Sequence, residues 1–120
     1  MAAKDVLGRA GEDRAVRHLI RNGYDVVDRN WRCDQGEIDI VAVWRDVLVF
    51  VEVKTRTTDA FGHPFEAVDT RKRRRLWQLA HAWIRVHPDQ VHGRGIRIDA
   101  IAVTGADART GVLEHLTDLL

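Results

Sequence analysis

The chain has 120 residues, of which 45% are hydrophobic and 31% are charged, and its formal net charge is +1. This length predicts one domain over residues 1–120, and the small net charge means that any affinity for nucleic acid must come from local clusters. A single cysteine excludes an internal disulfide and a multi-cysteine zinc site, and it is typical of a reducing compartment. The sequence contains no apolar run of membrane-spanning length and no signal-peptide pattern, so we expect a cytoplasmic protein.

The first predicted element is a helix over residues 4–22 that ends at Gly23, where a left-handed residue closes many helices. Ala15 and Leu19 recur at helical spacing on one side of it. Glu12 falls within this apolar stripe, where a carboxylate is unusual unless it is paired or binds a metal. Two interpretations are open: Glu12 faces inward toward a site, or the helix is rotated so that Glu12 reaches solvent or an arginine.

A β-hairpin is predicted in the middle of the chain. A short strand over residues 24–31 is followed by two longer apolar strands over residues 36–44 and 47–54, which a tight turn joins. In the resulting register Asp39 lies directly opposite Glu52. Because like charges at such positions destabilise a sheet, we expect a positive group, such as a divalent cation, between the two carboxylates.

The second half of the chain predicts a helix and a further strand. The helix begins at Asp69 or Thr70, either of which is a suitable N-cap, and runs to about Val86. The strand covers residues 95–103, and the weak pattern of the tail over residues 111–120 is open to a strand or a helix, with no clear place in the fold. The order of elements favours an α/β fold with a central mixed β-sheet flanked by helices.

The residues around Glu52 carry candidate chemistry. Lys54 follows Glu52 by two positions, so both side chains project from the same face of the strand. Carboxylates are hard ligands of Mg²⁺ (or Mn²⁺), and such an ion can activate water for phosphodiester hydrolysis. Lys54 can position that water or stabilise the developing charge, and the backbone carbonyl of Val53 is within reach of the ion. The alternative is an ordinary surface ion pair at the end of a hairpin.

An unbroken basic run begins the second predicted helix at residues 71–75. Positive charge at this end opposes the helix dipole and costs about 0.3–1 kcal/mol per exposed residue. A phosphate backbone is a fitting partner for such a run, whereas the alternative is a solvated face balanced by Glu66 and Asp69. The candidate nucleic-acid-binding residues are Arg56, Arg71, Lys72, Arg73, Arg74 and Arg75.

Several short motifs occur in the order typical of a known family. They are Gly8 with Glu12, Asn30-Trp31-Arg32, Gly36-Glu37-Ile38-Asp39, the block Val-Phe-Val-Glu-Val-Lys-Thr-Arg at residues 49–56, Phe61-Gly62 with Pro64, and Lys72. In these motifs, from about Gly8 to Val103, the chain resembles the YraN-like family of small bacterial proteins, which is placed in the PD-(D/E)XK nuclease superfamily.

The resemblance implies a restriction-endonuclease-like core similar to that of archaeal Holliday-junction resolvases, which work as dimers. Glu12, Asp39, Glu52 and Lys54 stand in the matching places, which favours the inward interpretation of Glu12. One departure is Ile38, which precedes Asp39 in place of the motif's proline, and many superfamily members share this departure.

The leading hypothesis is therefore a Mg²⁺-dependent, structure-selective endonuclease that binds nucleic acid, and the resemblance implies branched DNA as its substrate. Its metal ligands are Glu12, Asp39, Glu52 and the Val53 carbonyl, and its catalytic residues are Asp39, Glu52 and Lys54. The alternatives are a non-cutting nucleic-acid-binding or recombination accessory module with the same fold, and a purely structural interaction protein.

Overall fold

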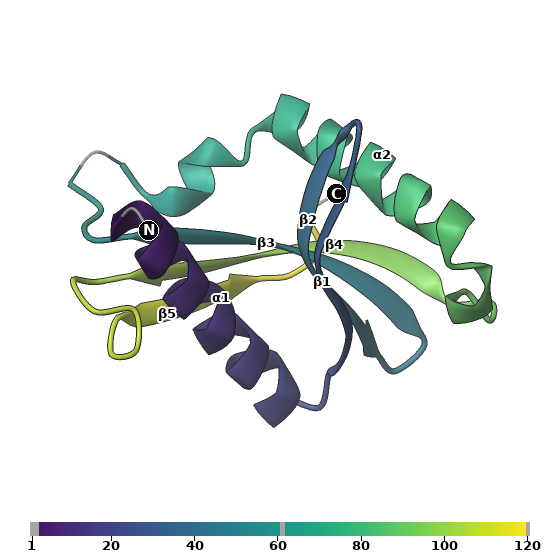
Figure 1. Cartoon of the computed structure of the whole chain (residues 1–120), viewed down its shortest axis with the longest axis horizontal. Coiled ribbons are helices and arrows are strands. Elements are labelled where there is room, and N and C mark those ends of the chain that lie inside the picture. The colour runs from purple at the N-terminus through teal and green to yellow at the C-terminus, as the bar shows by residue number, and fades with distance from the viewer. Residues whose placement is uncertain (1–2, 61, 120) are drawn as a thin grey trace.

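The computed structural model describes residues 3–60 and 62–119, so that Phe61, one of the motif residues, lies outside the described residues. It contains two α-helices, five β-strands and two short 3₁₀ turns (Figure 1). These are α1 (Ala3–Arg21), β1 (Asp25–Cys33), β2 (Gly36–Trp44), β3 (Val47–Arg56), η1 (Pro64–Ala67), α2 (Thr70–Val86), η2 (Pro88–Gln90), β4 (Gly95–Thr104) and β5 (Val112–Leu116).

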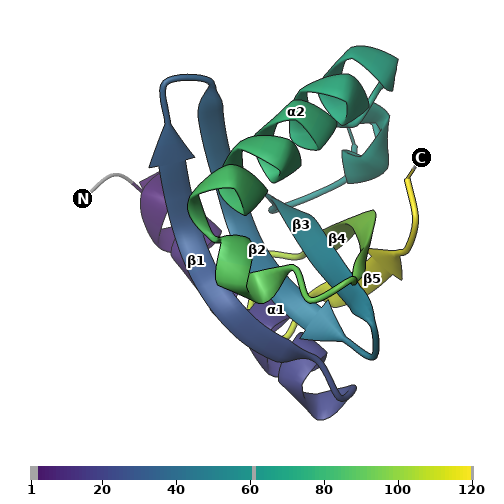
Figure 2. The ribbon, with the colours of Figure 1, turned by 90° about the vertical axis from the view of Figure 1, so that its right-hand side faces the viewer.

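The five strands form one mixed sheet in the order β1-β2-β3-β4-β5. β3 and β4 are parallel, while the other neighbouring strands are antiparallel. α1 covers one face of the sheet and α2 covers the other, as Figures 1 and 2 show together. The predicted α/β fold with a central mixed sheet flanked by helices is thus confirmed. Across the described residues, neither helix is long and apolar enough to cross a membrane.

The sequence explains where α2 begins and which face it buries. Asp69 is the N-cap, and its carboxylate accepts a hydrogen bond from the Lys72 backbone N–H at 2.9 Å. Leu76, Leu79 and Trp83 recur at helical spacing and are buried against the sheet. The second predicted helix is therefore confirmed in position and in orientation.

The structure differs from the predictions at the first strand and at the tail of the chain. β1 continues beyond the predicted end of its strand, because pairing with β2 extends as far as Cys33 opposite Gly36. The tail, which had no clear sequence pattern, forms β5 and pairs antiparallel with β4. Both strands lie at edges of the sheet, where pairing with one neighbour stabilises a segment of weak intrinsic preference.

Side-chain alternation along β2 is broken at Asp39. Ile38 packs in the apolar cluster beneath α2, whereas Ile40 packs in the cluster beneath α1, although residues two apart in a regular strand share a face. Asn30 occupies the place across from Asp39, between the pairs Arg29–Ile40 and Trp31–Ile38, and its φ is 53°. This left-handed residue reverses the faces beyond it, so the tip of the β1–β2 hairpin turns toward α2 (Figure 2).

Candidate functional site

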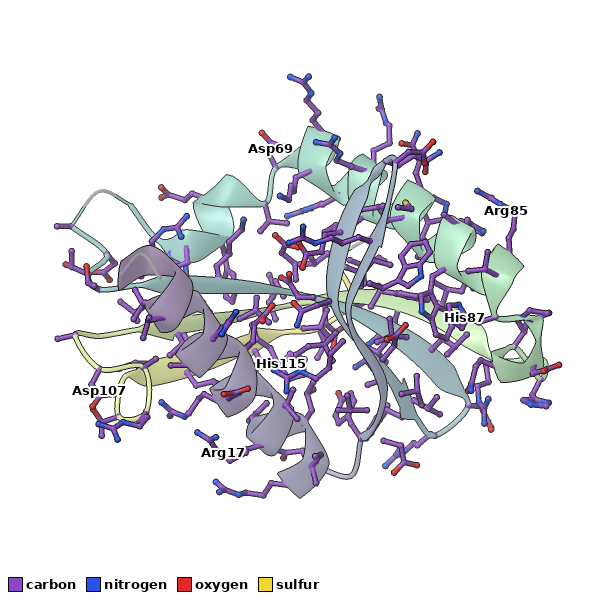
Figure 3. The ribbon with its side chains drawn as sticks, in the orientation of Figure 1. Arg17, Asp69, Arg85, His87, Asp107 and His115 are labelled. Atoms are coloured by element: carbon purple, nitrogen blue, oxygen red, sulfur yellow. The ribbon has the colours of Figure 1, made fainter. Side chains whose placement is uncertain are left out.

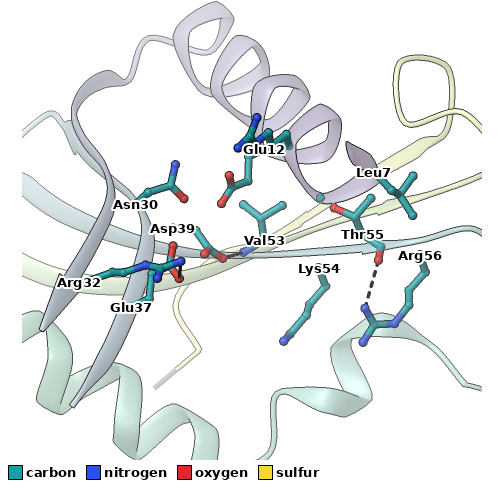
Figure 4. A pocket seen from close by; sticks show the side chains of 12 residues that line it. Leu7, Glu12, Asn30, Arg32, Glu37, Asp39, Val53, Lys54, Thr55 and Arg56 are labelled. Carbon is teal, nitrogen blue, oxygen red and sulfur yellow. Dashed lines mark hydrogen bonds and ion pairs between the residues drawn. The ribbon is translucent and has the colours of Figure 1, made fainter. Parts of the chain in front are cut away.

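Asp39 lies where β2 and β3 separate. The ladder between these strands follows the predicted register from the turn as far as Ile40 and Val51, and it stops there. One residue further, the Asp39 carboxylate accepts a hydrogen bond from the Val53 backbone N–H at 2.7 Å. The side chain thus takes the place of a backbone partner and is held at the opening between the two strands (Figure 4).

Two clefts meet at Asp39, one on each face of the sheet. The cleft on the α1 side has a volume of about 710 Å³, and Glu12, Asn30, Glu37 and Asp39 contribute to its lining. The cleft on the α2 side measures about 280 Å³, and its lining includes Glu37, Asp39 and Glu52. Asp39 and Glu37 therefore border both clefts, while Glu12 and Glu52 each border one.

Close packing of α1 on β3 carries Glu12 to this site. Gly11 lies so close to Thr55 that a Cβ atom at Gly11 would come within 2.9 Å of the threonine Cγ2 and 3.0 Å of its Cβ. Ala15, one turn further along, is buried against the sheet. Glu12 is consequently half-buried and points into the cleft that Asp39 lines (Figure 4), which agrees with the inward interpretation of this residue.

Asn30 joins two of the carboxylates. In the amide orientation that satisfies its hydrogen bonds, the side-chain nitrogen of Asn30 donates to Glu12 at 3.0 Å and to Glu37 at 3.1 Å. Burial raises the pKa of Glu12, and the Arg29 guanidinium partly offsets this effect. Asn30 thus combines a left-handed backbone with a side chain that organises the acidic cleft.

The electrostatic environment of Asp39 is strongly negative. Burial and then the neighbouring Glu52 carboxylate raise the pKa of Asp39 to about 8, and Glu12 and Glu37 act in the same direction. The hydrogen bond from Val53 opposes them. No arginine, lysine or histidine forms an ion pair with Asp39 across residues 3–60 and 62–119. Ionisation of Asp39 is therefore unfavourable without a cationic partner, and a bound cation would stabilise its charged form.

Glu52 has the opposite environment, because two cations contact it. It is buried, and its Oε1 atom lies 3.1 Å from Nζ of Lys54 and 3.4 Å from Nζ of Lys72. The contact with Lys54 agrees with the prediction that both side chains project from one face of β3. Lys72 comes from the first turn of α2, and its contact with Glu52 was not predicted.

The donor set fits a divalent cation by its chemistry. The carboxylates and the Val53 carbonyl are hard oxygen ligands, and the negative charge around Asp39 favours an ion there. In the described part of the chain, however, no three histidine, cysteine, aspartate or glutamate side chains converge on one point. Glu12 and Glu52 border different clefts, so that Asp39 is the residue common to both possible pairs of ligands.

The basic run divides into side chains with different surroundings. Arg73 donates from Nε to the Val68 carbonyl at 3.2 Å, and Arg75 donates from Nε to the Gln35 carbonyl at 3.3 Å. The second contact ties α2 to the tip of the β1–β2 hairpin. Arg56 is exposed beside the α1-side cleft, where its Nη1 donates to the Thr55 carbonyl at 3.1 Å.

One face of α2 presents a basic surface. The exposed Arg74 and Arg75 lie three and four positions after Arg71 and four and three positions before Gln78, which places the four residues on one side of the helix. They line a hollow of about 440 Å³ whose lining also includes Lys72 and the acidic residue Asp69. We call this the α2 basic face: Arg71, Arg74, Arg75 and Gln78.

Several residues of the site were not among the predicted functional residues, including Gly11, Asn30, Glu37 and Gln78. Asn30 and Glu37 occur in the blocks on which the family resemblance depends, so their positions carried a signal. Gln78 follows from helical spacing once Arg71 and Arg74 are placed on one face. The role of Gly11 follows only from the contact between α1 and β3.

The fold and the site together define an α/β protein whose mixed sheet agrees with a restriction-endonuclease-like core and whose carboxylates gather where two central strands separate. The chain matches the Uncharacterised protein family UPF0102 over residues 11–103 and belongs to that family. The predicted membership of the YraN-like group is thereby confirmed.

Relatives described as UPF0102 proteins match this chain over nearly its whole length. One from an Arthrobacter species is 52% identical over 116 residues, which are 97% of each chain. One from Beutenbergia cavernae is 50% identical over 116 residues, again 97% of each chain. A third, from Streptomyces griseus, is 48% identical over 115 residues and 96% of each chain.

Proposed function

We propose that this protein is a Mg²⁺-dependent (or Mn²⁺-dependent) endonuclease that hydrolyses phosphodiester bonds in structured nucleic acid, with branched DNA as the first substrate to test. In this proposal Asp39, Glu52 and the Val53 carbonyl hold the ion, and Glu12, which borders the other cleft that Asp39 lines, approaches it from α1 as a further ligand. Lys54 acts at the attacking water. The proposal follows the family resemblance and extends it to the residues of this chain.

The observation that carries the proposal is the charge around Asp39. Burial and the nearby carboxylates raise its pKa to about 8, and no ion pair compensates it within the described residues. A purely structural carboxylate is expected to have a cationic partner or several hydrogen-bond donors. Among residues 3–60 and 62–119 Asp39 has one such donor, the Val53 N–H, and its other oxygen is available to a ligand.

A bound divalent ion would polarise the phosphoryl group and make its water ligand more acidic. The chain's own residues then have separable tasks. Asp39 and Glu52 fix the position of the ion, and the Lys54 ammonium, 3.1 Å from Glu52, stabilises negative charge that develops on the phosphate. Asn30 keeps Glu12 directed into the cleft.

The positively charged residues suggest how a nucleic acid is held. The α2 basic face offers guanidinium groups suited to phosphate oxygens on one side of the site. Arg9, Arg32 and Arg56 line the cleft on the other side. A phosphate backbone that contacts both sets of arginines runs past the carboxylates, which lie between the two sets.

We further propose a cytoplasmic homodimer, following the resolvases that the chain resembles, and sedimentation analysis of the purified protein tests the dimer.

Cleavage assays test the proposed activity. Purified protein is incubated with branched and linear DNA and with RNA, with Mg²⁺, with Mn²⁺ and with a chelator. We expect metal-dependent products from the wild type and a loss of about two orders of magnitude or more in Asp39→Asn and in Glu52→Gln. Cleavage that survives both substitutions would refute the mechanism.

A non-cutting nucleic-acid-binding module is the second candidate. The observation in its favour is that Glu12 and Glu52 border different clefts and that no three acidic side chains converge among the described residues. This candidate predicts binding that weakens steeply with salt, because phosphate contacts release counterions, and no turnover with either metal. The same incubation, followed by a binding assay at several salt concentrations, separates the two candidates.

A further inference from the structure

Lys72 differs from the other members of the basic run in the partner that it contacts. Its Nζ lies 3.4 Å from Oε1 of Glu52, whereas Arg71 and Arg74 are exposed on the α2 basic face. The backbone of Lys72 is fixed, because its N–H donates to the Asp69 cap at 2.9 Å. Its side chain therefore starts from a defined point in the first turn of α2 and reaches toward the sheet.

Two lysines from different elements contact the Glu52 carboxylate. The Glu52 side chain is only 9% exposed, and a carboxylate so buried is stable in its charged form only with close cationic partners. Lys54 supplies one partner from the same strand, and Lys72 supplies the other across the interface between α2 and the sheet. Both contact the same oxygen, and Lys72 lines the cleft in which Glu52 and Asp39 meet.

We infer that Lys72 is a positioning residue of the carboxylate site and not a ligand for phosphate. Lys72 holds Glu52 from the α2 side, so that the orientation of this carboxylate toward Asp39 depends on the helix. Its positive charge also competes with a divalent cation for Glu52. The competition between Lys72 and a metal ion rests on the proposed function. The pairing of Lys72 with Glu52 does not depend on any activity.

A double-mutant cycle without metal or nucleic acid tests the pairing. The urea midpoints of the wild type, Lys72→Met, Glu52→Gln and the double variant are compared in a chelating buffer. We expect Lys72→Met to lower the midpoint in the wild type and to have a much smaller effect in the Glu52→Gln background. Equal effects in the two backgrounds would overturn the inference. This result stands whether or not the protein proves to be a nuclease.

Metal affinity tests the competition. Mn²⁺ binding is measured by calorimetry for the wild type, Lys72→Met, Lys72→Arg and the control Arg85→Met. Arg85 is an exposed residue in the last turn of α2 and projects outward from the helix (Figure 3), so its loss removes the same charge at the opposite end of α2 from Lys72. We expect Mn²⁺ to bind Lys72→Met up to about tenfold more tightly, because a nearby positive charge is gone. Lys72→Arg and Arg85→Met should resemble the wild type.

Tighter Mn²⁺ binding distinguishes the loss of a competing charge from general damage to the fold, which weakens metal binding, while the urea cycle tests whether Lys72 holds Glu52. Unchanged or weaker Mn²⁺ binding in Lys72→Met would overturn the inference. Failure of the wild type to bind Mn²⁺ would instead refute the proposed metal site, and the urea cycle would still decide whether Lys72 holds Glu52. With an active wild type, we expect Lys72→Met to lower kcat about tenfold with little change in KM. A change confined to KM and its salt dependence would assign Lys72 to phosphate.

Discussion

Replacement of Asp39 by asparagine should make the protein more stable at neutral and alkaline pH, although Asp39 lies at the centre of the candidate site. The asparagine side chain is nearly the same size, and its carbonyl oxygen can still accept the hydrogen bond from Val53. It cannot ionise, so the repulsion from Glu52, Glu12 and Glu37 that raises the pKa of Asp39 disappears. Stability is thus expected to increase where function is expected to be lost.

The size of the effect follows from the pKa. Between the ordinary aspartate value of 3.8 and the value of about 8 in the folded protein, the folded state holds a proton that the unfolded state has released. The stabilisation from this proton is complete below about pH 4 and is lost as the pH rises toward 8. At about 1.4 kcal/mol per pH unit the ceiling is about 6 kcal/mol, and partial exposure of Asp39 to water reduces it to about 2–3 kcal/mol.

Urea denaturation in a chelating buffer at several pH values between 4 and 9 measures this difference. We expect the free energies of unfolding of wild type and Asp39→Asn to be similar near pH 4. They should diverge as the pH rises, until the variant is about 2–3 kcal/mol more stable near pH 8. Addition of Mg²⁺ should then stabilise the wild type but not the variant, by about 3 kcal/mol at a hundredfold excess over Kd.

Two results would refute this reasoning. A constant difference between the two proteins across the pH range would mean that the folded state does not shift the ionisation of Asp39. A variant that is less stable than the wild type at pH 8 would mean that Asp39 is a favourable, compensated charge. The chelated wild type serves as the reference for both outcomes, because residual metal would conceal the repulsion.

Three further predictions concern residues around the site. Gly11→Ala should lower the free energy of unfolding by about 1–2 kcal/mol, because α1 must move away from β3 to make room for the new methyl group. Gly8 has open space around it, so Gly8→Ala should raise the free energy of unfolding by up to about 1 kcal/mol. Thermal unfolding of the two variants tests this difference. In the same assay, Asn30→Ala should lower the free energy of unfolding by about 1–2 kcal/mol. Asn30→Gly should lower it by less, because glycine adopts the left-handed backbone freely. Equal losses in the two variants would show that backbone strain at this position is unimportant. Replacing both Arg71 and Arg74 by methionine should reduce the slope of log K against log salt concentration by about 1–2 in a DNA-binding titration, and an unchanged slope would remove the α2 basic face from the interface.

Much of the fold was predictable because its signals are local. The apolar stripe of α2 and its Asp69 cap lie within one short segment, and the helix begins where that segment indicates. The register of the β2–β3 hairpin follows from a two-residue turn and from alternation, and it is observed from the turn as far as Ile40 and Val51, one pair short of the predicted Asp39–Glu52 pair. β5 was not predictable, because its five residues become a strand through pairing with β4.

The sequence by itself determined the types of most elements and the clustering of Asp39, Glu52 and Lys54 near one hairpin. Only the tertiary structure decided how these charges are divided between the two faces of the sheet. A strand pattern assumes that faces alternate without interruption, and the left-handed Asn30 breaks that alternation beside Asp39. Contacts between elements distant in sequence then place Glu12 on one side and Lys72 on the other, and no local periodicity encodes such contacts.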